Sequence, residues 1–216
     1  PPVDPLGSGG GWGDPHLYTP DGKLYDFHGY GEFIAMKSLT DNFEVQVRQG
    51  TLPYSLSTRA TVNTGIAVQT GEDIVCITSN RPKLFINNIE RDWNFEQIAL
   101  NAGASIKKIK EGSYPVIVIN SKKGDQVKVR LDASYISSYF DYSITPSQSR
   151  AGKVEGLLGN YDGNKNNDLR LTNGQPVENI FEQLYPAFAD SWRMVIAESK
   201  QGILGSLVQY IRLSCD

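Results

Sequence analysis

This sequence of 216 residues is poor in the residues that most enzyme sites and membrane spans require. Its only histidines are His16 and His28, too few for a zinc-type cluster, and it has neither a His-Glu-x-x-His segment nor a Gly-x-Ser-x-Gly turn. No apolar run approaches the roughly 20 residues that cross a bilayer. We therefore expect neither a conventional enzyme nor a transmembrane segment in this chain.

Positive charge is not concentrated anywhere along the chain. The net charge is −3, and Lys and Arg occur in small groups such as Lys107-Lys108 and Lys122-Lys123. Binding to phosphate backbones needs a concentrated basic face. Nucleic acid is therefore not an expected partner.

Cysteine is also scarce, since only Cys76 and Cys215 are present. In an oxidising compartment they can form one bridge, whereas in a reducing compartment they stay free. Cys76 lies in an apolar run where a small buried side chain is equally natural. Both interpretations stay open. A chain of this length can bury a sizeable core without such a bridge.

Alternation of apolar and polar residues is the main pattern that is present. Phe43, Val45 and Val47, for example, alternate with charged or amide side chains, as expected of half-buried strands. The predicted strands cover 32–37, 43–48, 65–69, 73–78, 83–87, 105–110, 116–120, 127–131 and 135–143. Helix is expected only over 178–188 and 195–213. The sequence therefore predicts an all-β fold, an antiparallel β-sandwich with minor helical segments near the C-terminus.

A run of oxygen-bearing side chains stands out between Gly159 and Asp168. Calcium binds six to eight oxygens from carboxylates, Asn amides and backbone carbonyls, so this run predicts a calcium site. The spacing does not fit the helix–loop–helix calcium motif, which needs Gly at the sixth position and Glu at the twelfth. The alternative is a polar surface turn, because Asn, Asp and Gly also favour turns for conformational reasons.

Four segments in the same order give the chain a family resemblance. They are Gly-Asp-Pro-His at 13–16, Gly-Tyr-Gly-Glu-Phe at 29–33, Gly-Asn-Tyr-Asp-Gly at 159–163 and Phe-Ala-Asp-Ser-Trp at 188–192. Together they resemble the von Willebrand factor type D domain. The resemblance implies an all-β calcium-binding domain over 13–193 that closes on a strand at 188–192. Residues 1–12, rich in Pro and Gly, would then be a flexible linker, and 194–216 a C-terminal tail.

The chain departs from the family pattern around the calcium loop. Glu155 and Leu158 stand where the disulfide-rich branch has cysteines. The sequence is therefore similar to the cysteine-poor branch found in bacterial surface proteins and membrane mucins. Disulfide-linked polymerisation is not expected.

The resemblance implies a set of calcium ligands. These are Asp21, Asn160, Asp162, Asn164 through its backbone carbonyl, Asn167 and Asp168. Lys165 and Asn166 would face solvent. Since Asp21 is distant in sequence from the others, the ion would hold two parts of the chain together. The alternative is that Asp21-Gly22 is a plain β-turn.

The bond between Asp14 and Pro15 is a second candidate site. In several members of the family this segment cleaves itself, with roles that would fall here on Asp14 as nucleophile and His16 as proton donor. Many members with the segment are not cleaved. We therefore favour the alternative, in which the segment is simply the first strand, with Pro15 at its edge and His16 hydrogen-bonded locally.

These observations predict a calcium-stabilised, extracellular protein-interaction or adhesion module of a larger surface or secreted protein. One alternative is a self-processing domain cleaved at Asp14-Pro15. Another is a carbohydrate-binding module that uses exposed Tyr and Trp side chains. The sequence does not name a protein partner.

Overall fold

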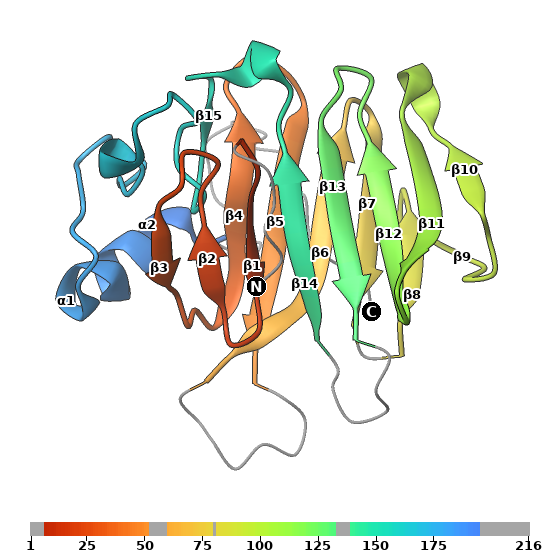
Figure 1. Ribbon diagram of the computed structural model, residues 1–216, viewed down its shortest axis with the longest axis horizontal. Helices are drawn as coiled ribbons and strands as arrows, with labels where there is room; N and C mark the ends of the chain where they lie inside the picture. Colours follow the sequence, from red (N-terminus) through yellow and green to blue (C-terminus); the bar gives the residue numbers. More distant parts are fainter. Residues whose placement is uncertain (1–6, 52–59, 80, 133–138, 195–216) are drawn as a thin grey trace, which may run out of the picture.

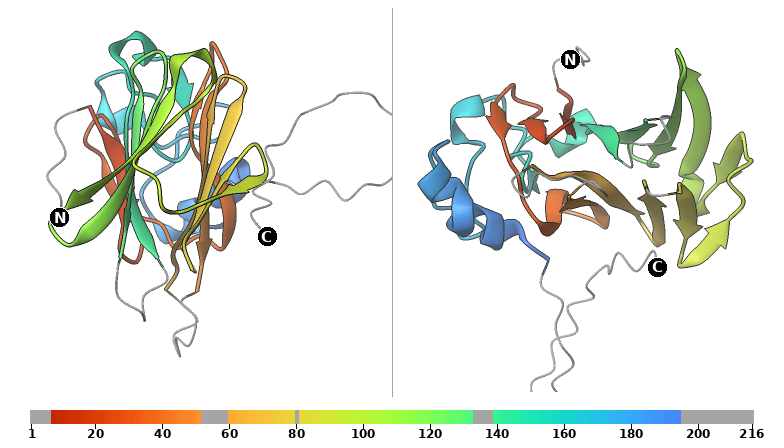
Figure 2. Two further views of the ribbon diagram at one scale, coloured as in Figure 1. Left: turned by 90° about the vertical axis from the view of Figure 1, so that its right-hand side faces the viewer. Right: turned by 90° about the horizontal axis from the view of Figure 1, so that it is seen from below.

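Two antiparallel sheets packed face to face make up the molecule (Figures 1 and 2). This computed structural model describes residues 7–51, 60–79, 81–132 and 139–194. The predicted all-β sandwich is therefore confirmed. The predicted tail helix over 195–213 and part of the strand over 135–143 lie outside the described residues.

The first sheet has eight strands in the order β10-β11-β12-β13-β14-β1-β2-β3. Its strands are β1 (Gly9–Trp12), β2 (His16–Tyr18), β3 (Leu24–Asp26), β10 (Gln97–Ala99), β11 (Ser105–Glu111), β12 (Tyr114–Asn120), β13 (Gln126–Leu131) and β14 (Phe140–Thr145). The N-terminal hairpin thus extends a sheet built mainly from the middle of the chain, and β3 forms its outer edge.

The second sheet has seven strands in the order β15-β4-β5-β6-β7-β8-β9. Its strands are β4 (Gly31–Ser38), β5 (Phe43–Gly50), β6 (Val62–Thr70), β7 (Asp73–Thr78), β8 (Lys83–Ile86), β9 (Ile89–Arg91) and β15 (Val154–Glu155). Short η turns at Asn101–Gly103 (η1), Gln148–Arg150 (η2) and Lys165–Asn167 (η3) connect or flank these strands.

The core lies between the sheets, where the alternating apolar residues meet. Val45 and Val47 of β5 are fully buried, as are Val129 of β13 and Phe140 of β14. The period of two in the sequence is therefore the period of inward-facing positions.

The flexible linker predicted for residues 1–12 is wrong for Gly9–Trp12. This segment is strand β1, paired on one side with β14 and on the other with β2. A Cβ at Gly10 would lie 2.1 Å from the carbonyl oxygen of Tyr142. Glycine is therefore what allows this strand to fit closely between its neighbours.

The strand predicted at 188–192 is also wrong, because the chain there is helical. Helical turns α1 (Phe181–Gln183), η4 (Leu184–Phe188) and α2 (Ala189–Trp192) follow one another beside β3 (Figure 1). Leu184, Phe188 and Trp192 are all buried. Tyr185 has extended backbone angles that break the helix after Leu184, and Phe188 and Trp192, four residues apart after this break, lie on one helical face. A helix was predicted over 178–188. The helical region in the structure begins at Phe181 and ends at Trp192.

A buried ion-pair cluster joins the loops at one end of the sandwich. The Arg150 guanidinium, 3% exposed, donates to both oxygens of Asp125 at 2.5 and 2.8 Å and to Asp41 at 2.8 Å. Burial opposes ionisation of both carboxyls, but the hydrogen bonds from Arg150 outweigh it and lower the pKa of each. Both carboxylates of the cluster therefore stay ionised well below neutral pH.

Cys76 is buried on β7, and Cys215 lies outside the described residues. A bridge between them thus stays a hypothesis. Within the described ranges, no helix has the length and apolar character needed to cross a bilayer.

Candidate metal site

The turn between β2 and β3 brings Asp21 to the Asn/Asp loop. The Thr19 amide donates to the Lys23 carbonyl and the Gly22 amide to the Thr19 carbonyl, each at 2.9 Å, which places Asp21 in a tight turn. The Asp21 carboxylate accepts from the amides of Asp162 at 2.9 Å and Gly163 at 3.0 Å. Asp21 thus lies in a turn, and its carboxylate contacts the Asn/Asp loop that the family resemblance pairs with it.

Asp162 organises the loop through its side chain. One carboxylate oxygen accepts from the side-chain amides of Asn160 at 2.9 Å and Asn167 at 2.8 Å. The other accepts from the backbone amide of Asn164 at 2.9 Å. These bonds, led by that of Asn167, lower the pKa of Asp162 and keep it ionised.

Asp168 is the buried carboxylate of the group, with 3% of its surface exposed. It accepts from the Thr19 hydroxyl at 2.6 Å and, weakly, from the Asn160 amide at 3.4 Å. Burial, together with the negative charges of Asp21 and Asp162, raises the pKa of Asp168 to about 6, although the hydrogen bonds from Thr19 and Asn160 act to lower it. Negative charge is thus concentrated here with no cationic side chain bonded to Asp168 among the described residues.

Two amide oxygens at the site have no protein partner. The Oδ1 atoms of Asn160 and Asn167 are buried, and neither accepts a hydrogen bond from any described residue. A buried acceptor without a partner is costly and calls for an explanation. Amide oxygens beside carboxylates are the donor set that calcium takes.

The remaining loop residues are already engaged or exposed. The Asn164 carbonyl accepts from the Asn167 amide at 3.1 Å, and the Asn164 side chain accepts from the Asn166 amide at 3.2 Å. Lys165 and Asn166 are exposed, as expected. Over the described ranges, no three His, Cys, Asp or Glu side chains are grouped closely enough to form a metal cluster by themselves. The carboxylates bind loop amides instead.

Glycine at position 159 makes room for the buried carboxylate. Gly159 has φ of 78°, and a Cβ there would lie 2.2 Å from Asp168 Oδ1. Gly163 also has a positive φ, 88°, but a Cβ there would meet nothing within 4 Å. Both glycines of the Gly-Asn-Tyr-Asp-Gly segment thus suit the backbone conformation, and only Gly159 is also needed for space.

Sequence reasoning assigned no role to Thr19, although it is central to the site. Its hydroxyl donates to Asp168 and also accepts from the Lys23 amide at 2.9 Å, so it links the turn to the loop. The sequence does show a polar residue directly before Pro20-Asp21. The structure adds that this residue is buried, with 1% of its surface exposed.

The Asp14-Pro15 segment is a turn between β1 and β2, so the prediction of a first strand there is wrong for residues 13–15. His16 opens β2, and its Nδ1 lies 2.6 Å from Asp26 Oδ1 on β3. Its Nε2 lies 3.3 Å from Asp14 Oδ1. His16 is thus bonded locally, as expected, but between two carboxylates. Asp26 had no predicted role.

Comparison with known proteins shows which domain family the chain belongs to. The model of the von Willebrand factor type D domain matches residues 9–175. The chain belongs to this family. The match begins at β1, which confirms that the von Willebrand factor type D fold here includes residues before the Gly-Asp-Pro-His segment.

Several curated proteins resemble this von Willebrand factor type D chain. It is 29% identical to hemocytin of Bombyx mori over 86% of its length, and 26% identical to human Sushi domain-containing protein 2 over 76%. It is 23% identical to rat mucin-2 over 84%. The aligned part is 5%, 20% and 11% of these three relatives, so the chain spans at most a fifth of their length.

Proposed function

We propose that this von Willebrand factor type D domain is a calcium-stabilised, extracellular module for protein association or adhesion within a larger protein. The observation that carries the calcium part is the pair of buried, unpartnered oxygens on Asn160 and Asn167 beside three carboxylates. A divalent cation would satisfy both oxygens and offset the charges of Asp21 and Asp162, which add to burial in raising the pKa of Asp168.

The residues present fit a calcium ion in their chemistry. Asp21, Asp162 and Asp168 would neutralise it, and Asn160, Asn167 and the Asn164 carbonyl would supply further oxygens. The ion would strengthen a contact that already exists, between the β2–β3 turn and the loop. Its role would be to hold the fold and not to perform chemistry.

The proposed extracellular location and the proposed role in association are based on the family and on the names of similar proteins. Mucin-2, zonadhesin of Sus scrofa and human IgGFc-binding protein each align with most of this chain. The name of the IgGFc-binding protein refers to binding another protein. A small stabilised sandwich that corresponds to a small part of such proteins suits a role in association more than one in catalysis.

Calorimetric titration of the metal-free chain tests the calcium site. We expect one calcium bound per chain, with magnesium bound more weakly because it requires tighter geometry. Asn167→Ala should weaken calcium binding at least tenfold. The neighbouring Asn166→Ala should leave it unchanged, since Asn166 is exposed. No heat of binding in the parent chain, or equal loss in both variants, would contradict the site.

A second candidate function, self-processing at Asp14-Pro15, is favoured by the contacts of His16. Asp26 bonds one ring nitrogen and the other faces the Asp14 carboxylate. A carboxylate oxygen of Asp14 would form a bond to its own carbonyl carbon, while the bond to the Pro15 nitrogen breaks. His16 would give that nitrogen a proton, and water would then open the cyclic anhydride to two carboxyl groups.

Intact mass measured after incubation between pH 5 and 7.5 tests this second function. Cleavage should give a fragment that begins at Pro15, and it should be absent in Asp14→Asn and after unfolding. Asp4-Pro5 has the same dipeptide chemistry and serves as the internal control. Equal cleavage at both bonds would show ordinary acid lability instead.

A further inference from the structure

Strand β3 leaves one of its edges open. The Thr19 amide bonds the Lys23 carbonyl at 2.9 Å, and the Phe27 amide bonds the Pro15 carbonyl at 3.0 Å, which fixes the phase of the β2–β3 ladder. Backbone groups alternate in direction along an antiparallel strand, so those of Leu24 and Asp26 point away from β2. Within the described ranges, nothing bonds these outward groups.

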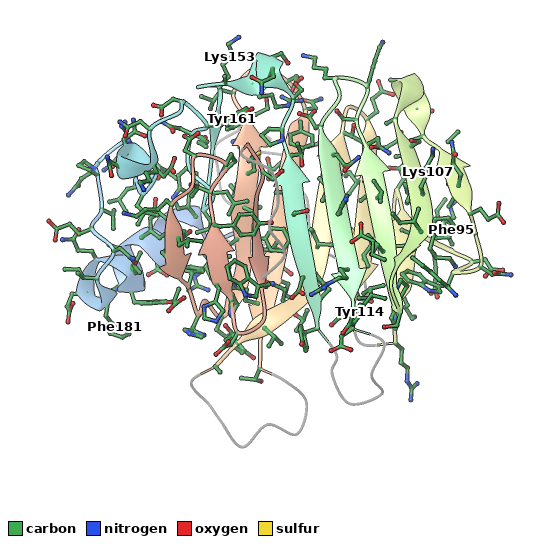
Figure 3. The ribbon with its side chains drawn as sticks, in the orientation of Figure 1. Phe95, Lys107, Tyr114, Lys153, Tyr161 and Phe181 are labelled. Carbon is green, nitrogen blue, oxygen red and sulfur yellow. The ribbon has the colours of Figure 1, made fainter. Side chains whose placement is uncertain are left out.

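A groove of about 1020 Å³, lined by both apolar and polar side chains, lies along this open edge, between β3 and the C-terminal helical turns. Its walls include Leu24 and, from the helical side, Phe181, Leu184 and Tyr185. Leu24 is 64% exposed and Phe181 72% exposed, among the largest exposures of any large apolar side chain described. Figure 3 shows Phe181 at the outer margin of the molecule on this side. We call this feature, bounded by β3 and Phe181, the β3 groove.

The open edge ends where the helical turns close it. The next outward amide, that of His28, already donates to the Tyr185 hydroxyl. The groove therefore offers backbone groups at two residues only, Leu24 and Asp26. A short extended segment that lies along these residues fits this site better than a helix, which has no free backbone groups to pair with a strand edge.

The charges around the β3 groove are mostly acidic. Asp26 lines it, with one oxygen bonded by His16. Glu178 and Glu182 are exposed and adjoin the lining residues Asn179 and Phe181. Lys23, half-buried, adjoins Leu24, and His28 is a further nitrogen-bearing side chain in the lining. A second copy of the chain would bring like charges together, whereas a basic segment would be attracted.

We propose that an extended, apolar and basic segment of a partner protein pairs with β3 as an additional strand of the eight-stranded sheet. This proposal rests on the associative function above and names the chemistry of the partner. Apolar side chains at alternate positions enter the groove against Leu24 and Phe181. Basic side chains between them face the acidic rim.

Titration by amide NMR with two synthetic seven-residue peptides tests the proposal. One peptide alternates Val and Lys, and its control alternates Val and Glu. The Val/Lys peptide should give saturable shifts at the amides of Leu24 and Asp26, at least fivefold tighter than any shifts from the control. No saturable shift, or equal affinity for the two peptides, would overturn the proposal.

Matched variants distinguish binding in the β3 groove from nonspecific binding to exposed apolar side chains. Phe181→Ala should weaken binding of the Val/Lys peptide at least fivefold. Tyr30→Ala removes an aromatic side chain that is 69% exposed but does not line the groove, and it should change nothing. Equal affinity in both variants would contradict the site. If the chain binds calcium but not the peptide, the β3 site alone is wrong and the calcium-stabilised module stands.

Discussion

The hydroxyl of Thr19 donates to the buried carboxylate of Asp168 at 2.6 Å, across 149 positions of sequence. This bond holds the β2–β3 turn of the first sheet against the Asn/Asp loop that follows β15 of the second. Together with the Asp21 carboxylate on the loop amides, it means that the candidate calcium site is also a junction of the fold.

Removing this hydroxyl should destabilise the protein. We expect Thr19→Val to lower the free energy of unfolding by about 1–3 kcal/mol, because it leaves a buried carboxylate without a partner of similar quality. Thr19→Ser keeps the hydroxyl and should recover most of the loss. Chemical denaturation measures both. Equal stability of the Val and Ser variants would show that the bond contributes nothing.

The two glycines of the loop should respond differently to alanine. Gly159→Ala forces a Cβ to within 2.2 Å of Asp168 Oδ1 at a positive φ, and should cost about 3 kcal/mol. Gly163→Ala adds only the cost of a positive φ, about 1 kcal/mol, since a Cβ there meets nothing within 4 Å. Thermal or chemical unfolding of the pair checks this order, and the reverse order would contradict the packing described around Asp168.

The Arg150 cluster should govern acid stability. Asp41 and Asp125 have folded-state pKa values below 3.8, so their contribution is present above that pH and is lost as pH falls through the folded values. Arg150→Met leaves the carboxylates without this partner and should cost about 3–5 kcal/mol at pH 7. The difference from the parent chain should begin to shrink towards pH 3, because the carboxyls of the unfolded chain and of the variant, which lack this partner, take up protons first.

Lys83→Met is the control for that variant. The Lys83–Glu90 pair is about half exposed, and its loss should change stability by less than about 1 kcal/mol at either pH. Unfolding free energies of the three proteins at pH 7 and pH 3 complete the test. A difference for Arg150→Met that stays constant with pH would contradict the assignment of the effect to these carboxyls.

Strands with a clear side-chain period were predictable from sequence. The strand predicted over 127–131 begins one residue earlier, at Gln126, and its residues alternate between buried and half-buried along its whole length. Gly9–Trp12 was missed, since three of its four residues are glycines with no pattern to read, and only pairing with β14 and β2 makes it a strand. The helical turn at 188–192 was missed because the family resemblance implied a strand there.

The residues of the candidate metal site could be named from the sequence, but the hydrogen bonds and contacts between them could not. The density of oxygens between Asn160 and Asp168 is a sequence property. The contributions of Thr19 and Gly159 depend on contacts with Asp168 that arise only when the turn and the loop meet. The pairing of His16 with Asp26 likewise follows from the register of β2 and β3, which no local pattern reveals.

The central claim, that calcium holds this junction, is tested most directly by the melting temperature of metal-free protein with and without calcium. A hundredfold excess of free calcium over Kd adds about 2.7 kcal/mol, or roughly 5 to 10 °C for a domain of this size. Asp162→Asn should abolish the increase, whereas Asp190→Asn, an exposed carboxylate elsewhere, should keep it. An identical melting temperature with calcium and with excess chelator would contradict the account.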